Sequence, residues 1–251
     1  MTAAHYRPWE PLLPATWAVK GTALVVAPHP DDEILGCGGV VAAHRDQGVE
    51  VHVAVMTDGG LGNPGGDGGP EYVALRKEET LRALDLLGGA EHHFLDYPDG
   101  SLKDNWGPVG DLVSLIDRVR PTTLLLPSPY EVHPDHRATS LIAFRAVRAA
   151  AEKPELLCYE VGAMMPANLL LDITPQMLKK EAAVRAFPSQ LLHHDLVAKV
   201  RALNHARTVN VDDAAIRYAE AYLRVDPARA DGFLDIVEQL LRLTDDMGPS
   251  L

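Results

Sequence analysis

Two short polar segments contain the residues that could do chemistry. The first, His29-Pro30-Asp31-Asp32-Glu33, places one imidazole and three carboxylates within five residues. The second, His133-Pro134-Asp135-His136, places two imidazoles around one carboxylate. Imidazole and carboxylate side chains bind zinc, and they also act as general acids and bases. The two segments are therefore candidates for a metal centre and for acid–base catalysis.

Each polar segment follows an apolar run and precedes a segment of helical composition. The apolar runs 23–27 and 122–126 are typical of strands, and 33–47 and 137–151 favour helices. In an open α/β sheet the turns at the carboxyl ends of strands form the ligand crevice, so both polar segments should face one crevice. Capping of a helix by Asp31 or Asp32 would explain one carboxylate but none of the histidines.

The rest of the chain predicts an α/β fold. Strand and helix alternate between residues 22 and 151, which indicates a Rossmann-like, doubly wound, mostly parallel sheet with helices on both faces. Further strands are expected at 49–56, 92–95, 156–161 and 169–173. Further helices are expected at 71–87, 107–120, 175–186, 191–205, 213–225 and 231–243. We expect one domain over 1–251, with a core at about 22–173 and a C-terminal helical part at 174–251.

The composition excludes several classes of partner. Thirty-five Asp and Glu residues against 23 Lys and Arg residues give a formal net charge of -12, which disfavours binding to nucleic acid or to an anionic membrane surface. No run of 18 apolar residues predicts a membrane span, and residues 1–20 lack the apolar core of a signal peptide. Cys37 and Cys158 stand in apolar surroundings, which favours a reduced, cytoplasmic setting.

A glycine-rich stretch at 59–70 predicts a loop beside the crevice. Gly60, Gly62 and Gly65 have the spacing of a dinucleotide-binding fingerprint. That fingerprint needs a helix to begin at once, so that the helix N-terminus meets the pyrophosphate, but further Gly and Pro residues follow here. Nucleotide binding, and with it a nicotinamide-dependent oxidoreductase, is therefore disfavoured.

The polar segments resemble those of a known family, the zinc-dependent deacetylases of the PIG-L or LmbE type, which remove acetyl groups from N-acetylglucosamine conjugates. The resemblance covers most of residues 22–223, because further motifs match as well: Gly38-Gly39, Arg76-x-x-Glu79, Leu87-Gly88, Pro98-Asp99-Gly100, Lys180, Ala183, Ser189-Gln190 and Tyr218-Ala219-Glu220. It implies a hydrolase that takes a small amino-sugar substrate and holds one Zn²⁺ per chain. Relatives of this type often form homo-oligomers, so a homo-oligomer is also implied.

The resemblance assigns the metal ligands and the base. It implies that His29, Asp32 and His136 bind zinc and that Asp31 acts as the general base. Three protein ligands leave a coordination position open for water, whose pKa zinc lowers to about 7. Asp31 adjoins Asp32 in the same tight turn, so it could reach that water without binding the metal.

The resemblance also implies roles for four other residues. His133 would stabilise the oxyanion or protonate the leaving amine, and Asp135 would orient His133 or tune its charge. Arg76 and Asp99 would contact the sugar. Arginines on helices are usually solvated, but Arg76 follows the glycine-rich loop and its guanidinium could bind sugar hydroxyls through two donors.

Other functions stay open at this stage. One alternative within the same chemistry is an amidase that cleaves a larger acyl group from a sugar-linked thiol conjugate. Another is a Rossmann-like protein that binds a metal or a nucleotide without turnover. A base, an acid and three ligands together exceed what binding alone requires, so the leading prediction is a zinc-dependent N-deacetylase of an N-acetylglucosaminyl conjugate.

Overall fold

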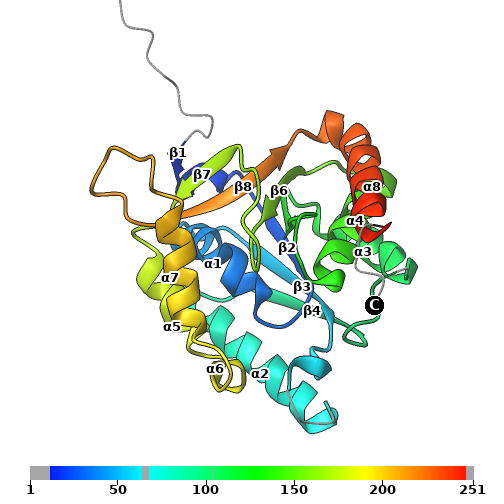
Figure 1. The fold of residues 1–251 in the computed structure, drawn as a ribbon, viewed down its shortest axis with the longest axis horizontal. Helices are drawn as coiled ribbons and strands as arrows, with labels where there is room; N and C mark the ends of the chain where they lie inside the picture. Colours follow the sequence, from blue (N-terminus) through cyan, green and yellow to red (C-terminus); the bar gives the residue numbers. More distant parts are fainter. Residues whose placement is uncertain (1–11, 64–67, 104, 247–251) are drawn as a thin grey trace, which may run out of the picture.

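An eight-stranded mixed sheet runs through the computed structural model, which describes residues 12–63, 68–103 and 105–246 (Figure 1). The strand order is β1-β7-β8-β6-β5-β2-β3-β4. Most neighbours are parallel, and β8 is antiparallel to both β6 and β7. The strands are β1 (Leu12–Pro14), β2 (Ala23–Ala27), β3 (Val51–Thr57), β4 (Glu91–Tyr97), β5 (Thr123–Pro127), β6 (Glu155–Tyr159), β7 (Leu169–Asp172) and β8 (Ala219–Val225).

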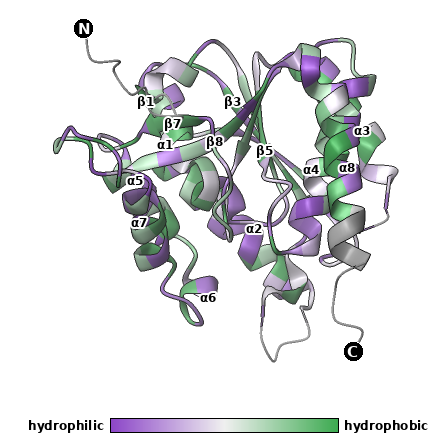
Figure 2. Cartoon of the chain, turned by 45° about the horizontal axis from the view of Figure 1, so that its top comes forward, coloured by the Kyte–Doolittle hydropathy of each residue, from purple (hydrophilic) through white to green (hydrophobic). Residues whose placement is uncertain are grey.

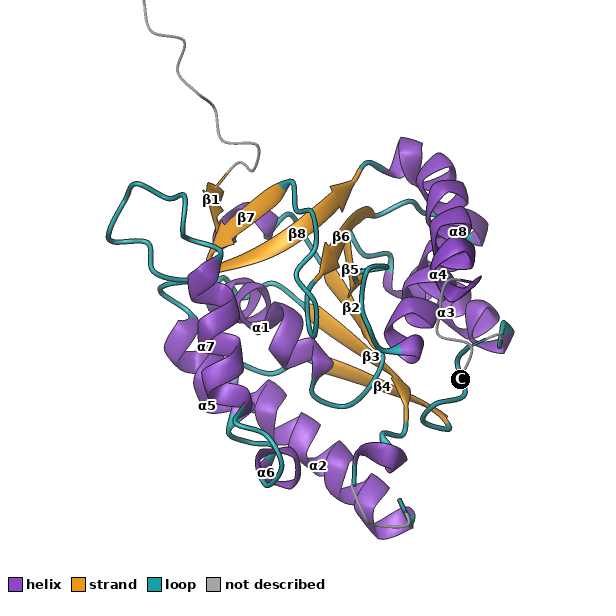
Figure 3. Ribbon diagram, viewed as in Figure 1, coloured by secondary structure: helices purple, strands orange, loops and turns teal. Residues whose placement is uncertain are grey.

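Helices cover both faces of the sheet (Figure 3). One face carries α1 (Asp32–Asp46), α2 (Pro70–Leu86), α5 (Met177–Val184), α6 (Pro188–Leu191) and α7 (Leu196–Ala206). The other face carries α3 (Gly107–Val119), α4 (Pro134–Ala149) and α8 (Ala230–Asp246). Three 3₁₀ turns complete the described elements: η1 (Ala15–Ala18), η2 (Gly60–Gly62) and η3 (Pro227–Arg229). The predicted α/β class with a mostly parallel sheet is confirmed.

The central strands are apolar along their whole length because both of their faces are covered. Every residue of β2 is buried. Val25 belongs to the core under α1 and α5, whereas Leu24 and Val26 belong to the core under α3 and α4. β3 and β5, the two neighbours of β2, are coloured mainly as hydrophobic in Figure 2. A parallel strand packed on both faces reads as a continuous apolar run rather than as an alternation.

The order of the strands reverses beside β2. From β2 the chain steps outward to β3 and then to β4, but β5 returns to the opposite edge of β2. Because these strands are parallel, the loops that follow them all emerge at one edge of the sheet. A reversal of this kind opens a crevice between the diverging loops, here the turns after β2 and β5. These are the two turns that carry the polar segments.

The helix predicted at 213–225 is wrong. Residues 219–225 form β8, which lies between β6 and β7 inside the sheet. Sheet neighbours on both edges and helices on both faces bury most of this strand, so no alternating pattern marks it in the sequence. The part at 174–251 is therefore not purely helical. The helix predicted at 191–205 is also wrong in extent, because α6 and α7 replace it, and β1 was not predicted.

Two smaller observations complete the fold. None of the helices among the described residues combines the length and the apolar character needed to cross a bilayer. Residues 64–67 of the predicted glycine-rich loop lie outside the described residues, and η2 occupies the beginning of that stretch.

Candidate active site

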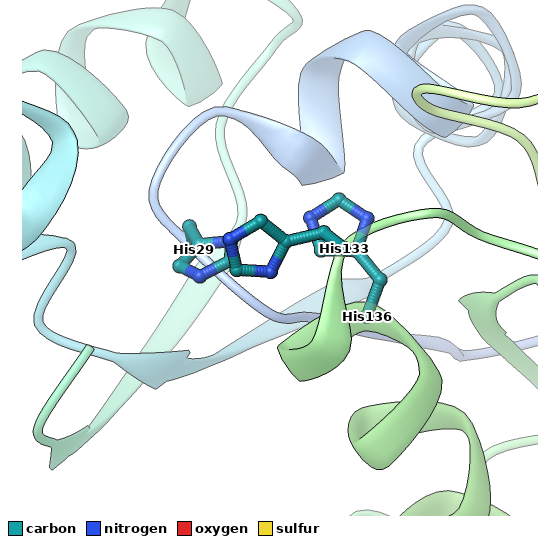
Figure 4. Close-up of side chains that lie close together, drawn as sticks. All are labelled: His29, His133 and His136. Atoms are coloured by element: carbon teal, nitrogen blue, oxygen red, sulfur yellow. The ribbon is translucent and has the colours of Figure 1, made fainter. Parts of the chain in front are cut away.

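The turn after β2 and the turn after β5 bring three histidines together. His29 lies in the first turn, just before α1, whereas His133 and His136 lie at the start of α4 (Figure 4). His133 is the N-cap of α4 and Pro134 is its first helical residue, a position where proline is favoured because its missing N–H is not needed. The ring centres of His29 and His136 are 5.2 Å apart, and those of His29 and His133 are 4.8 Å apart.

Asp32 joins the two turns. Its Oδ2 atom lies 3.1 Å from His29 Nδ1 and 3.1 Å from His136 Nε2, and it also accepts the backbone N–H of His29 at 3.1 Å. Ligands about 2.0–2.2 Å from a tetrahedral zinc ion are roughly 3.3 Å from one another. The two Asp32–imidazole separations are close to this spacing, and two imidazoles with one carboxylate are a donor set that zinc takes.

In His29 and His136, the ring nitrogen that does not face Asp32 lies near another carboxylate. His136 Nδ1 lies 3.5 Å from Glu131 Oε2, and Glu131 in turn accepts the backbone N–H groups of Val161 and Gly162 at 2.7 and 3.0 Å. His29 Nε2 lies 3.1 Å from Asp99 and 3.4 Å from Asp135. A carboxylate that accepts the N–H of a metal-binding imidazole fixes the orientation of the ring and strengthens it as a ligand, and Glu131, Asp99 and Asp135 are the carboxylates near these nitrogens. The sequence did not single out Glu131, and its place two residues before His133 was the available signal.

The electrostatics of the cluster favour a deprotonated Asp32 beside protonated His29 and His136. Burial alone would raise the pKa of Asp32, but His136 and His29 hold that pKa well below its ordinary value. Burial would lower the pKa of His136, yet the adjacent Asp32 and Glu131 raise it to about 9. Burial opposes protonation of His29 as well, and its contacts with Asp135, Asp32 and Asp99 raise its pKa overall. A cluster that attracts protons this strongly would also attract a divalent cation.

Two other groups of donor atoms share His29. Ligand atoms of His29, His133 and His136 all lie within 4.8 Å of one another, and so do those of His29, Asp99 and Asp135. The first group adds His133 to the two predicted imidazole ligands. The second group places Asp99 and Asp135 behind His29, where the sequence had not placed them.

Asp31 is held apart from Asp32 although the two are neighbours. Its backbone has φ 114° and ψ -29°, a conformation that non-glycine residues rarely adopt. Asp32 Oδ2 faces the imidazoles, whereas Asp31 Oδ2 accepts a hydrogen bond from Arg76 Nη2 at 3.2 Å. Burial and the charge of Asp32 raise the pKa of Asp31 to about 7, against the opposing effect of Arg76. Burial and the charge of Asp31 raise the pKa of Glu33 to about 8.

His133 and Asp135 differ from the expected pairing. The Asp135 carboxylate accepts the backbone N–H groups of Gly100 and Leu102 at 2.7 and 3.2 Å, and it faces His29. The contact to His133 comes instead from the backbone N–H of Asp135, which donates to His133 Nδ1 at 3.2 Å. Burial and the adjacent His29 and His136 lower the pKa of His133, so its neutral form is favoured before substrate binds. The predicted catalytic roles of both residues stay predictions.

Arg76 and Asp99 both lie at the site, and each already has a protein partner. Arg76 is only 2% exposed and also donates to the carbonyl of Pro30. A side chain at Gly62 would collide with the Arg76 guanidinium, so glycine at that position leaves room for it. Asp99 accepts the backbone N–H of Leu61 at 3.0 Å in addition to its contact with His29. Their predicted contacts with a sugar stay predictions.

Comparison with known proteins supports the reading of both turns. Residues 24–147, which include both polar segments, match the family model described as PIG-L, GlcNAc-PI de-N-acetylase. The chain is 32% identical over 184 residues to diacetylchitobiose deacetylase of Thermococcus kodakarensis, an alignment that covers 66% of this chain and 69% of that protein. The chain belongs to the PIG-L family. The family predicted from the motifs is thus confirmed.

One solved structure and a further relative also resemble the chain. The N,N'-diacetylchitobiose deacetylase of Pyrococcus horikoshii superposes with a TM-score of 0.74 at 25% identity, covering 86% of this chain and 90% of the other. The 4-oxalmesaconate hydratase of Pseudomonas putida is 28% identical over 234 residues, covering 82% of this chain and 90% of that protein. The chain is thus similar to a protein named as a hydratase as well as to deacetylases.

Proposed function

We propose that this PIG-L protein is a zinc-dependent deacetylase that hydrolyses the N-acetyl group of an N-acetylglucosaminyl conjugate and releases acetate. The observation that carries the proposal is the contact of one Asp32 oxygen with both His29 and His136, beside the separately held carboxylate of Asp31. The family model and the relative that deacetylates diacetylchitobiose support the choice of reaction and of an amino-sugar substrate.

Amide hydrolysis needs a polarised carbonyl, an activated water and a proton for the departing amine. His29, Asp32 and His136 would hold the zinc ion, which would supply the Lewis acidity that polarises the acyl carbonyl and makes water a stronger acid. Asp31 is the neighbouring carboxylate that is not assigned as a zinc ligand. It would accept the proton that water loses as it attacks, and a carboxylate whose pKa is raised toward neutrality is a stronger base than an ordinary aspartate.

His133 is suited to the other side of the reaction. It stands at the start of α4, is more exposed than His29 and His136, and has one ring nitrogen bound to a backbone N–H. Its other nitrogen can donate a hydrogen bond to the developing oxyanion, or carry a proton to the leaving amine. Asp99, which contacts His29, and Arg76, which contacts Asp31, are the groups that would also bind sugar hydroxyls.

The test is acetate release from N-acetylglucosamine conjugates by the zinc-loaded protein, with the chelated protein and the Asp31→Asn variant as controls. Zinc-dependent acetate release that Asp31→Asn abolishes supports the proposal. Release of a larger acyl group from a sugar-linked thiol conjugate, with no acetate release, would favour the amidase alternative. Turnover of 4-oxalmesaconate without amide hydrolysis would place the chain with its hydratase relative.

Two further properties belong to this proposal. We place the protein in the cytoplasm, because its two cysteines, Cys37 and Cys158, are both buried and unpaired. The predicted homo-oligomer stays a prediction, and sedimentation of the purified protein tests it.

A further inference from the structure

The peptide bond between Pro30 and Asp31 is held at both of its polar ends. Arg76 Nη2 donates to the carbonyl oxygen of Pro30 on one side. On the other side, the backbone N–H of Asp31 donates to Glu33 Oε2 at 3.0 Å. Arg76 and Glu33 therefore form hydrogen bonds with opposite ends of one peptide plane. A rotation of this plane would break both hydrogen bonds.

The peptide held by these two hydrogen bonds precedes an unfavourable backbone conformation at Asp31. Asp31, at φ 114°, is one of three non-glycine residues with positive φ among the described residues. Conformations of this kind are strained and persist only where the surroundings enforce them. The conformation turns the Asp31 carboxylate toward Arg76, while the next residue, Asp32, turns toward the imidazoles.

Glu33 forms this hydrogen bond from a position where its carboxyl group has no contact with solvent. Its side chain is fully buried, and its Oε1 atom has no hydrogen-bond partner among the described residues. A buried carboxyl with an unsatisfied oxygen is costly, and a hydrophobic side chain of the same size would pack in this place without that cost. Its other carboxyl oxygen, Oε2, accepts the backbone N–H of Asp31.

We propose that Glu33 is a positioning residue for the general base: it holds the Pro30–Asp31 peptide so that the Asp31 carboxylate stays apart from the metal ligands and beside Arg76. Arg76 holds the other end of the same peptide. The effect on catalysis rests on the function proposed above, because it requires Asp31 to be the base. The effect on the backbone does not depend on any activity.

The first experiment is structural and compares two variants. Glu33→Gln keeps an oxygen that can accept the Asp31 N–H, whereas Glu33→Met has a similar size and no such acceptor. In crystal structures of the purified proteins we expect Glu33→Gln to retain the positive φ of Asp31 and Glu33→Met to lose it. A Glu33→Met structure with the Pro30–Asp31 peptide unchanged would overturn the proposal.

A second variant covers the case in which Glu33→Met does not fold. Glycine adopts positive φ without steric cost, so with Asp31→Gly the backbone should no longer need the Glu33 hydrogen bond to hold this conformation. The double variant Asp31→Gly/Glu33→Met should then fold where Glu33→Met does not. If the double variant fails to fold as well, Glu33 serves the core in general and the positioning role is wrong.

The kinetic experiment uses zinc-loaded protein and acetate release. Displacement of a catalytic group by about 1 Å costs on the order of 100-fold, so Glu33→Met should lower kcat by about 10-fold to 100-fold with KM and zinc content unchanged. Glu33→Gln should restore most of kcat. In the Asp31→Asn background, Glu33→Met should cause no further loss, and an additional loss there would contradict a role through Asp31. If the wild-type protein releases no acetate, the proposed function fails, and the crystal structures still decide the role of Glu33.

Discussion

Asp32 Oδ2 lies 3.1 Å from His136 Nε2, although the two residues come from different strand-to-helix turns. The same oxygen is equally close to His29 Nδ1, so one carboxylate links the turns after β2 and β5. We expect His29→Ala, Asp32→Ala and His136→Ala each to lower the zinc content of the purified protein. Metal analysis checks this, with Asp31→Asn as the matched control that should keep its zinc. Retention of one zinc per chain in all three alanine variants would show that the ligand set is wrong.

Asp31→Asn should lower kcat by about 10² to 10⁴, the usual contribution of a positioned general base. Because Asp31 must be deprotonated to act, kcat should fall as the pH decreases. Burial and Asp32 raise its pKa to about 7, and a cation at Asp32 would lower that value, so the acid limb of the pH profile is expected at or below about pH 7. Steady-state rates from pH 4 to 9 check this. Loss of zinc together with activity in Asp31→Asn would instead make Asp31 a ligand.

Asp135→Asn should weaken zinc binding, because the Asp135 carboxylate faces His29 Nε2 at 3.4 Å. Loss of a carboxylate behind a metal-binding imidazole typically costs 10-fold to 100-fold in metal affinity. Competition with a chelator measures the affinity, and Asp99→Asn, on the same face of His29, should behave alike. Unchanged zinc affinity with a shifted alkaline limb of the pH profile would restore the role first predicted for Asp135, which is to act on His133.

Lys180→Met should destabilise the fold strongly. Lys180 Nζ lies 2.7 Å from Glu220 Oε1, and both side chains are buried. Glu220 also accepts the backbone N–H groups of Gly39 and Val40, where α1 is interrupted by the non-helical conformation of Cys37. Removing one partner of a buried ion pair typically costs about 3–5 kcal/mol, because the other charge stays buried.

Urea denaturation checks the Lys180→Met prediction. The double variant Lys180→Met/Glu220→Gln is the control, since it removes both charges and keeps a polar group for the α1 backbone. It should be more stable than Lys180→Met alone. A free energy of unfolding for Lys180→Met equal to that of the wild type would contradict the importance of the pair.

His44 should make the protein less stable in mild acid. It is fully buried in α1 with Nδ1 2.8 Å from the carbonyl oxygen of Val40, and burial lowers its pKa from the ordinary value of 6.5. Above pH 6.5 His44 is neutral in both states and has no effect. Below that pH the unfolded chain takes up a proton that the folded chain does not, so stability falls until the lowered pKa is reached. Tm measured from pH 5 to 8 should therefore decline less in His44→Gln than in the wild type at equal zinc content.

The sequence by itself predicted the central strands and the polar turns that follow them, because these features depend on residues that are neighbours in the chain. Continuous apolar runs at 23–27 and 122–126 predicted the central strands, because strands covered on both faces need apolar residues at every position. The polar residues that follow each run marked the crevice, because parallel strands end at the same edge of a sheet. The family motifs lie in these turns, so the family and the candidate ligands could be predicted together.

Tertiary structure decided what depends on contacts between distant segments. The 213–225 stretch was predicted to be a helix, yet its last seven residues form β8, since pairing with β6 and β7 outweighs the local helix preference of Ala, Glu and Leu. Asp135 was predicted to act on its neighbour His133, but its carboxylate reaches the 98–102 turn and His29 instead. The Glu33–Asp31 hydrogen bond is local to one turn, but the Arg76–Pro30 hydrogen bond has no local signature, because Arg76 comes from α2 and reaches Pro30 only in the folded chain.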